Sequence, residues 1–148
     1  MSWAERVLNT LSVHGHRVTG PRRAILEQIM LYSQPFSAEQ LFRDLGGVGG
    51  PIGRATIYRT VDLLLGDGWL SRVHWRAARE ASNGHDHAYV AVEQGLRHHI
   101  VCRSCGVVVA IAGEQIDILA NQSAEHAGFA YEACSLELYG TCPTCQLR

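Results

Sequence analysis

Two C-x-x-C pairs constrain this 148-residue chain more than any other feature of its sequence. Cys102 and Cys105 form the first pair, Cys142 and Cys145 the second, and 36 residues separate the pairs. Two such turns can complete the tetrahedral four-sulfur shell that structural zinc sites prefer. Because a closed shell leaves no open coordination position, we predict one structural Zn²⁺ per chain. A redox pair and inert buried thiols are the alternatives.

The remaining composition is that of a soluble globular protein, with 47% hydrophobic and 18% charged residues. No apolar run approaches the length of a membrane span. The N-terminus lacks the charged region, apolar stretch and cleavage site of a signal peptide. We therefore expect a cytoplasmic protein with no membrane partner.

Charge is distributed unevenly along the chain. Residues 1–79 hold ten Arg and six acidic residues, a balance of +4, whereas residues 80–148 hold three Arg and eight acidic residues, a balance of -5. Such a change of sign is expected if only the first half faces phosphates. Chance asymmetry is the alternative.

The first half has the pattern of helices followed by a hairpin. Thr19 and Ser37 are good N-cap residues, and apolar residues recur at helical spacing after each of them. The predicted elements are helices over 3–14, from Pro21 to near Ser33, from Ser37 to about Leu45 and over 54–66, then strands over 69–75 and 87–93. This order is typical of a winged helix-turn-helix domain, in which the last helix reads DNA.

The second half predicts a small α/β unit. We expect strands at 100–102, 107–111 and 131–139, with a helix at 114–127. About 50 residues are near the lower limit for independent folding, so a metal or a partner chain would help. The predicted fold class is α+β, with a winged-helix DNA-binding domain over 1–93 and a dimerisation and metal-binding domain over 94–148.

Several motifs, in order, make the chain resemble the Fur family of metal-dependent repressors over nearly its whole length. They are the stretches 17–26, 37–41, 55–61 (Ala-Thr-Ile-Tyr-Arg-Thr-Val), 98–106 (His-His-Ile-Val-Cys-Arg-Ser-Cys-Gly) and 128–145. The resemblance implies a homodimer that binds a pseudo-palindromic DNA operator when a regulatory metal is bound, and represses transcription.

The resemblance also implies DNA-binding residues. Tyr58 and Arg59 match the family's DNA-contacting pair, and their chemistry suits bases and phosphates. We expect Thr56 and Arg54 to hold the DNA backbone and Arg17 to approach the minor groove. Core packing is the alternative for Tyr58.

Family members place a sensing metal between the two domains. His99 keeps the family position three residues before Cys102, but the usual ligands are absent at Ser71, Val92, Leu96 and Arg97. Our hypothesis is a relocated site that binds zinc. We expect His85, His87, Glu93 and His99 to supply most of its ligands. The alternative is an exposed polar turn with solvated histidines.

A second, peripheral family site corresponds to His98, Asp117 and Cys134, where Cys replaces the usual His and favours zinc. Cys134 as a simple buried residue is the alternative. Because the usual sensing ligands are missing, a degraded sensing site in a metal-insensitive repressor is one alternative function. An iron, manganese or peroxide sensor on the same scaffold is another. We expect no enzyme and no small organic substrate, because Cys134 and His98 lack an evident third, orienting group.

Overall fold

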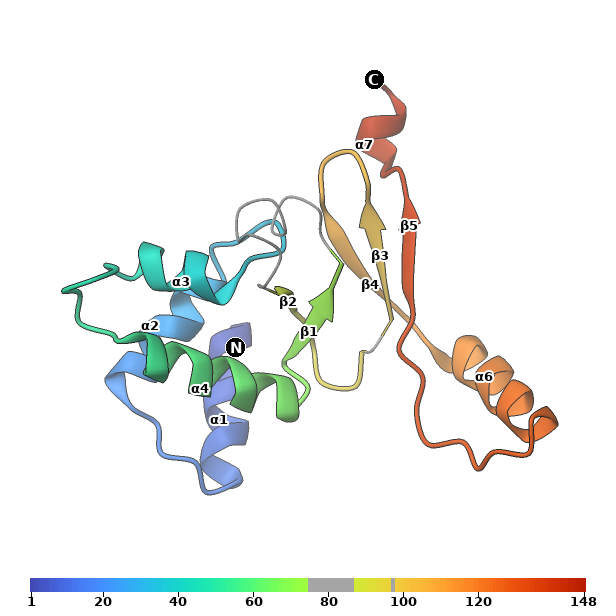
Figure 1. Ribbon diagram of the computed structural model, residues 1–148, viewed down its shortest axis with the longest axis horizontal. Coiled ribbons are helices and arrows are strands. Elements are labelled where there is room, and N and C mark those ends of the chain that lie inside the picture. The colour runs from blue at the N-terminus through green and yellow to red at the C-terminus, as the bar shows by residue number, and fades with distance from the viewer. Residues whose placement is uncertain (75–86, 97) are drawn as a thin grey trace. The chain divides into compact units, whose positions relative to one another are not determined.

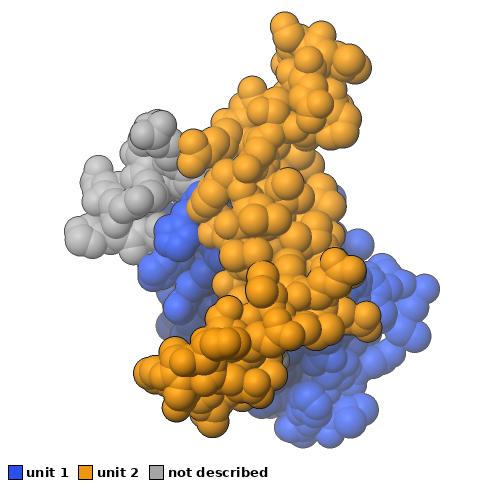
Figure 2. All heavy atoms as spheres, turned by 90° about the vertical axis from the view of Figure 1, so that its right-hand side faces the viewer, with its two compact units in different colours: residues 1–94 blue, residues 95–148 orange. Residues whose placement is uncertain are grey.

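The computed structural model describes residues 1–74, 87–96 and 98–148 (Figure 1). The chain divides into two compact units, Met1–Gln94 (unit 1) and Gly95–Arg148 (unit 2), which Figure 2 draws in two colours. The boundary lies one residue after the one drawn from the sequence. Among the described residues, no helix has the length and hydrophobicity that a membrane crossing requires.

Unit 1 begins with four helices, and a hydroxyl caps each of the first three. They are α1 (Trp3–Val13), α2 (Gly20–Ile29), α3 (Ala38–Asp44) and α4 (Arg54–Gly66). Ser2, Thr19 and Ser37 each accept a hydrogen bond from the backbone N–H three residues on, at 3.3, 3.3 and 3.0 Å. Each bond satisfies a donor that the first turn of a helix leaves unpaired.

The apolar faces of the four helices meet in one core. Each helix contributes residues at helical spacing, and the segments between and after the helices add large side chains. The largest of the fully buried residues are Val7, Leu11, Ile25, Leu26, Ile29, Phe36, Leu41, Ile57, Val61 and Leu64. Ile57, Val61 and Leu64 occupy the inner face of α4. Residues on the opposite face of this helix therefore point away from the core.

A two-stranded hairpin follows the helices. Strand β1 (Leu70–Val73) pairs antiparallel with β2 (Ala88–Ala91), Leu70 lying opposite Ala91. Both strands are shorter than predicted. Phe36 and Tyr89 exchange backbone hydrogen bonds of 3.0 and 2.8 Å, so the segment before α3 continues the pairing at β2. The order of helices and hairpin is the predicted winged helix-turn-helix order.

Unit 2 is a three-stranded sheet with a helix and a short final turn. Its elements are β3 (His98–Cys102), β4 (Val108–Ile111), α6 (Glu114–His126), β5 (Glu137–Gly140) and α7 (Pro143–Gln146). β3 is central, antiparallel to β4 and parallel to β5. The predicted mixture of helix and sheet is therefore confirmed, although α7 was not predicted.

The last strand starts six residues later than predicted, at Glu137 instead of residue 131. Just before this strand, Leu136 pairs with β3 only through its carbonyl, which accepts the His99 N–H at 3.0 Å. Tyr131 donates its hydroxyl hydrogen to Asp117 at 2.8 Å, and the backbone N–H of Leu136 donates to the His98 ring at 3.2 Å. Alternating apolar residues alone do not reveal such side-chain bonds.

Candidate functional site

The four paired cysteines gather at one end of the sheet in unit 2. Cys102 ends β3, and its register partner on the parallel strand β5 is Gly140, two residues before Cys142. Adjacent parallel strands therefore deliver both C-x-x-C turns to the same place. Gly106 closes the first turn with a φ of 80°, a conformation that suits glycine, and its N–H donates to the Cys102 carbonyl at 2.9 Å.

The sulfur positions fit a tetrahedral ion. All four Sγ atoms lie within 4.8 Å of one another, and the Sγ atoms of Cys105 and Cys142 are 3.7 Å apart. A tetrahedron with zinc–sulfur bonds of 2.3 Å has edges of about 3.8 Å. The backbone N–H of Cys142 also donates to the Cys102 sulfur at 3.3 Å. The predicted four-cysteine set thus fits a structural zinc site.

The pKa values of the cysteines show why a cation belongs in the cluster. Backbone N–H groups of Cys105 and Cys142 lower the pKa of Cys102 to about 6. The thiol of Cys145 has its pKa raised to about 12, first by its hydrogen bond with Cys142 and then by burial. Without a cation, one of the four cysteines ionises easily, but the ionisation of all four is unfavourable. A divalent ion reverses this balance, because a coordinated thiol loses its proton.

Helix α4 presents the predicted DNA-binding pair to solvent. Tyr58 is 39% exposed and Arg59 is exposed, whereas Ile57, Thr60 and Val61 are buried. Tyr58 is therefore not a core residue. Thr56 is half-buried beside them, and Arg17 is exposed before α2, its carbonyl accepting a hydrogen bond from Arg22.

Arg54 has a tighter environment than the sequence indicates. Its guanidinium donates two hydrogen bonds to the Glu39 carboxylate, at 3.1 and 2.8 Å, and lies 4.1 Å from the centre of the Phe42 ring. These hydrogen bonds raise the pKa of Arg54 and lower the pKa of Glu39. Arg54 thus ties the start of α4 to α3, and its side chain is still 52% exposed.

The predicted sensing residues belong to different parts of the chain. His85 lies outside the described residues, and His87 is exposed in unit 1 beside the Tyr89 ring. In unit 2, His99 is 2% exposed, and its Nε2 has no hydrogen-bond partner among the described residues. Burial lowers the pKa of His99, which favours the neutral form of the imidazole that a metal ion requires in a ligand.

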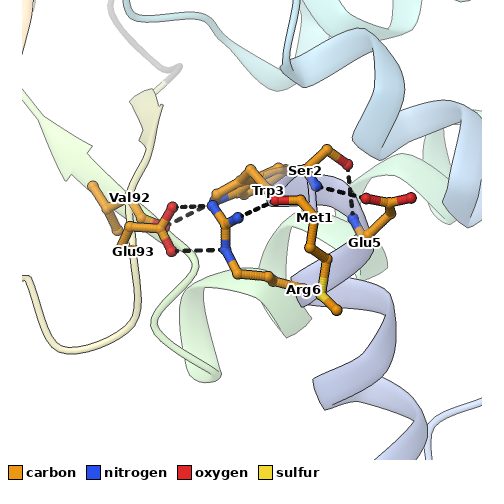
Figure 3. Close-up of polar contacts among 7 residues, drawn as sticks. All are labelled: Met1, Ser2, Trp3, Glu5, Arg6, Val92 and Glu93. Carbon is orange, nitrogen blue, oxygen red and sulfur yellow. Dashed lines mark hydrogen bonds and ion pairs between the residues drawn. The ribbon is translucent and has the colours of Figure 1, made fainter.

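Glu93 contacts helix α1, and no pattern in the sequence indicates this contact (Figure 3). Its two carboxylate oxygens accept hydrogen bonds from the Nε and Nη2 atoms of Arg6. The Trp3 indole donates to the neighbouring Val92 carbonyl at 2.9 Å. Glu93 therefore ties the end of unit 1 to the start of α1, and a metal ion has to compete with Arg6 for it.

The three residues of the predicted peripheral site are only partly brought together. His98 Nε2 lies 3.4 Å from Asp117 Oδ1. Among the described residues of unit 2, the only group of three or more His, Cys, Asp or Glu side chains close enough to share an ion is the four-cysteine cluster, so Cys134 does not join this pair.

A four-helix unit with a hairpin, followed by a sheet with a zinc-type cluster, defines the class of winged-helix regulators with a cysteine-rich second unit. Residues 13–139 match the ferric uptake regulator family, and the chain belongs to that family. Members of this family regulate transcription and are not enzymes.

Three similar proteins illustrate the family's range. The chain is 34% identical to a ferric uptake regulation protein of Neisseria meningitidis serogroup A, over 90% of this chain and 89% of that one. It is 28% identical to a zinc uptake regulation protein of Mycobacterium tuberculosis, over 92% and 99%. A zinc uptake regulator solved with zinc and DNA matches with a TM-score of 0.77 and 23% identity, over 97% and 93%, and shows the same fold.

Proposed function

We propose that this chain is a metal-responsive repressor that binds a pseudo-palindromic double-stranded DNA operator as a homodimer. The observation that carries the proposal is the division of α4 into two faces. Ile57, Val61 and Leu64 anchor the helix in the core, while Tyr58 and Arg59 face solvent. An anchored helix that presents Arg and Tyr has the chemistry of a major-groove reader.

An exposed apolar row supports the homodimer. Val109, Ile100 and Leu138 lie directly opposite one another on the three strands of unit 2 and are 51%, 37% and 39% exposed. On α6, Ile118 and Leu119 are 59% and 64% exposed. A contiguous exposed row such as the one on the sheet marks an interface, and a second copy of the chain is the occupant we propose.

For the metals, we propose one structural Zn²⁺ in the four-cysteine cluster and a second, regulatory divalent ion. The ligand candidates for the second ion remain His85, His87, Glu93 and His99, and zinc is the preferred ion. The buried Nε2 of His99, which has no hydrogen-bond partner in the described part of the chain, supports this assignment. Imidazole and carboxylate ligands also suit iron and manganese, so an iron, manganese or peroxide sensor is the alternative.

A metal-insensitive family member is the second candidate, and one observation favours it. The carboxylate of Glu93 is already neutralised by Arg6. If that pair persists in the DNA-bound state, the regulatory site lacks its one carboxylate.

The experiment is a metal-by-metal DNA titration on protein that keeps its cysteine-bound zinc and has lost exchangeable metal. A DNA site is first selected from a random double-stranded library, and its affinity is then measured with zinc, manganese, iron(II) or chelator. We expect zinc to tighten binding at least about tenfold, and a variant with His87→Ala and His99→Ala to lose this response. Equal affinity in all conditions supports the metal-insensitive candidate, and failure to select any site contradicts DNA recognition.

A further inference from the structure

The pair of His98 and Asp117 occupies the position at which the family resemblance implies a peripheral metal. His98 belongs to β3, and Asp117 lies in the first turns of α6. In Figure 1, α6 lies at the end of the sheet where β3 and β5 begin. The residues at this position do not fit a metal ion, as the next observations show.

Both nitrogens of His98 are already used. Its side chain is 3% exposed, and its Nδ1 accepts the backbone N–H of Leu136 at 3.2 Å. An accepting Nδ1 carries no proton, so the proton of the neutral ring is on Nε2. That nitrogen lies 3.4 Å from Asp117 Oδ1, the distance of an ion pair or a weak polar contact. Neither nitrogen has a lone pair left for a metal.

The surroundings of the ring are also closed. A Cβ atom on Gly113 would lie 2.2 Å from His98 Cδ2 and 2.5 Å from Nε2, so the Gly113 backbone runs close against the Nε2 edge. Zinc–nitrogen bonds are about 2.0–2.1 Å long, so an ion would need space on this side. The hydroxyl of Tyr131 occupies the same Asp117 oxygen at 2.8 Å.

We propose that His98, Asp117 and Tyr131 form a metal-independent hydrogen-bonded brace in place of the peripheral metal site. The brace links three segments: β3 through His98, α6 through Asp117 and the loop before β5 through Tyr131 and Leu136. None of the residues of α6 is buried in the single chain, so this helix has little apolar packing of its own. A charge-assisted hydrogen bond from Tyr131 to a carboxylate supplies an attachment that needs no second ion.

Three single variants distinguish a brace from a metal site. Asp117→Asn keeps an oxygen that can accept from both Tyr131 and His98, but an amide is a poor ligand for zinc. Cys134→Ser removes the sulfur that a metal site requires and leaves the brace intact. Tyr131→Phe removes the donor of the brace and leaves all three proposed metal ligands in place.

The measurements are zinc per chain after loading and mild chelation, and the melting temperature with and without added zinc. We expect Asp117→Asn and Cys134→Ser to retain as much zinc as the unmodified chain. Tyr131→Phe should lower the melting temperature by about 5 °C to the same extent in both conditions. Loss of one zinc per chain in Asp117→Asn or Cys134→Ser overturns the proposal, as does an unchanged melting temperature in Tyr131→Phe. Neither readout involves DNA, so the result is independent of the proposed repressor function.

Discussion

Arg6 and Glu93 join the first helix of unit 1 to its last residues by a two-pronged ion pair. Arg6 also donates to the carbonyl of Met1, so one guanidinium holds the chain start and the end of the hairpin segment together (Figure 3). Both side chains are partly exposed, at 38% and 47%, and such pairs are worth up to about 1 kcal/mol. The pair is therefore weak enough for a metal ion to displace.

The first prediction concerns this competition. If Glu93 is a regulatory ligand, Arg6→Gln frees its carboxylate and should tighten regulatory zinc binding by up to about fivefold. Glu93→Gln should weaken it. Competition titration with a zinc-sensitive dye measures both. Changes of the same sign in the two variants, or no change in either, would show that the pair has only a structural role.

The second prediction concerns the cysteine cluster. Cys142→Ser should lose the tightly held zinc, unfold unit 2 and yield monomers, because the binding energy of a structural zinc contributes directly to folding. Cys134→Ser is the matched control, since Cys134 lies outside the cluster. Zinc per chain and sedimentation velocity are the measurements. A zinc-free, folded dimer of Cys142→Ser is incompatible with this role.

The third prediction concerns the exposed face of α4. Arg59→Ala should weaken binding to the selected DNA site by about 1–3 kcal/mol while the fold is preserved, because Arg59 is exposed and outside the core. Fluorescence anisotropy and circular dichroism measure the two quantities. Arg148→Ala is the control, as it removes the same charge from the exposed end of unit 2. Equal losses in the two variants would indicate only a general effect of charge.

The fourth prediction concerns pH and the pair of Glu39 and Arg54. The hydrogen bonds from Arg54 lower the pKa of Glu39 from 4.5, so the pair stabilises unit 1 above pH 4.5 and loses this effect as the pH falls through the lowered value. Glu39→Gln should therefore reduce stability more at pH 7 than at pH 3. Urea unfolding followed by tryptophan fluorescence measures unit 1, because all three tryptophans lie before residue 94. A loss of the same size at both pH values contradicts the ionic origin.

The fifth prediction concerns the apolar row of unit 2. Ile100→Asp places a charge in the middle of this row and should convert the dimer into a monomer that still holds its cysteine-bound zinc. Leu147→Asp is the control, because Leu147 is 90% exposed and lies outside the row. Light scattering and zinc content are the readouts. A dimeric Ile100→Asp protein would move the interface elsewhere.

Local rules predicted most of unit 1. The hydroxyl caps at Thr19 and Ser37 and the apolar positions Ile57, Val61 and Leu64 depend on neighbours three or four residues away, so the sequence itself carries them. Tyr58 lies outside the core, so the alternative of core packing for it is wrong. In unit 2 the alternation near residue 131 was misleading, because the N–H of Leu136 is bonded to the His98 side chain and pairing with β3 begins only at the Leu136 carbonyl.

The sequence alone determined the helix starts, the inner faces of the helices and the presence of two metal-type cysteine turns. Only the tertiary structure decided that β3 and β5 are parallel neighbours whose ends bring Cys102 and Cys142 together, that Arg6 holds Glu93, and that both nitrogens of His98 are used. The physical reason is the range of the interactions. Caps and helical faces depend on adjacent turns, whereas a hydrogen bond between residues 38 or 87 positions apart depends on how the whole chain packs.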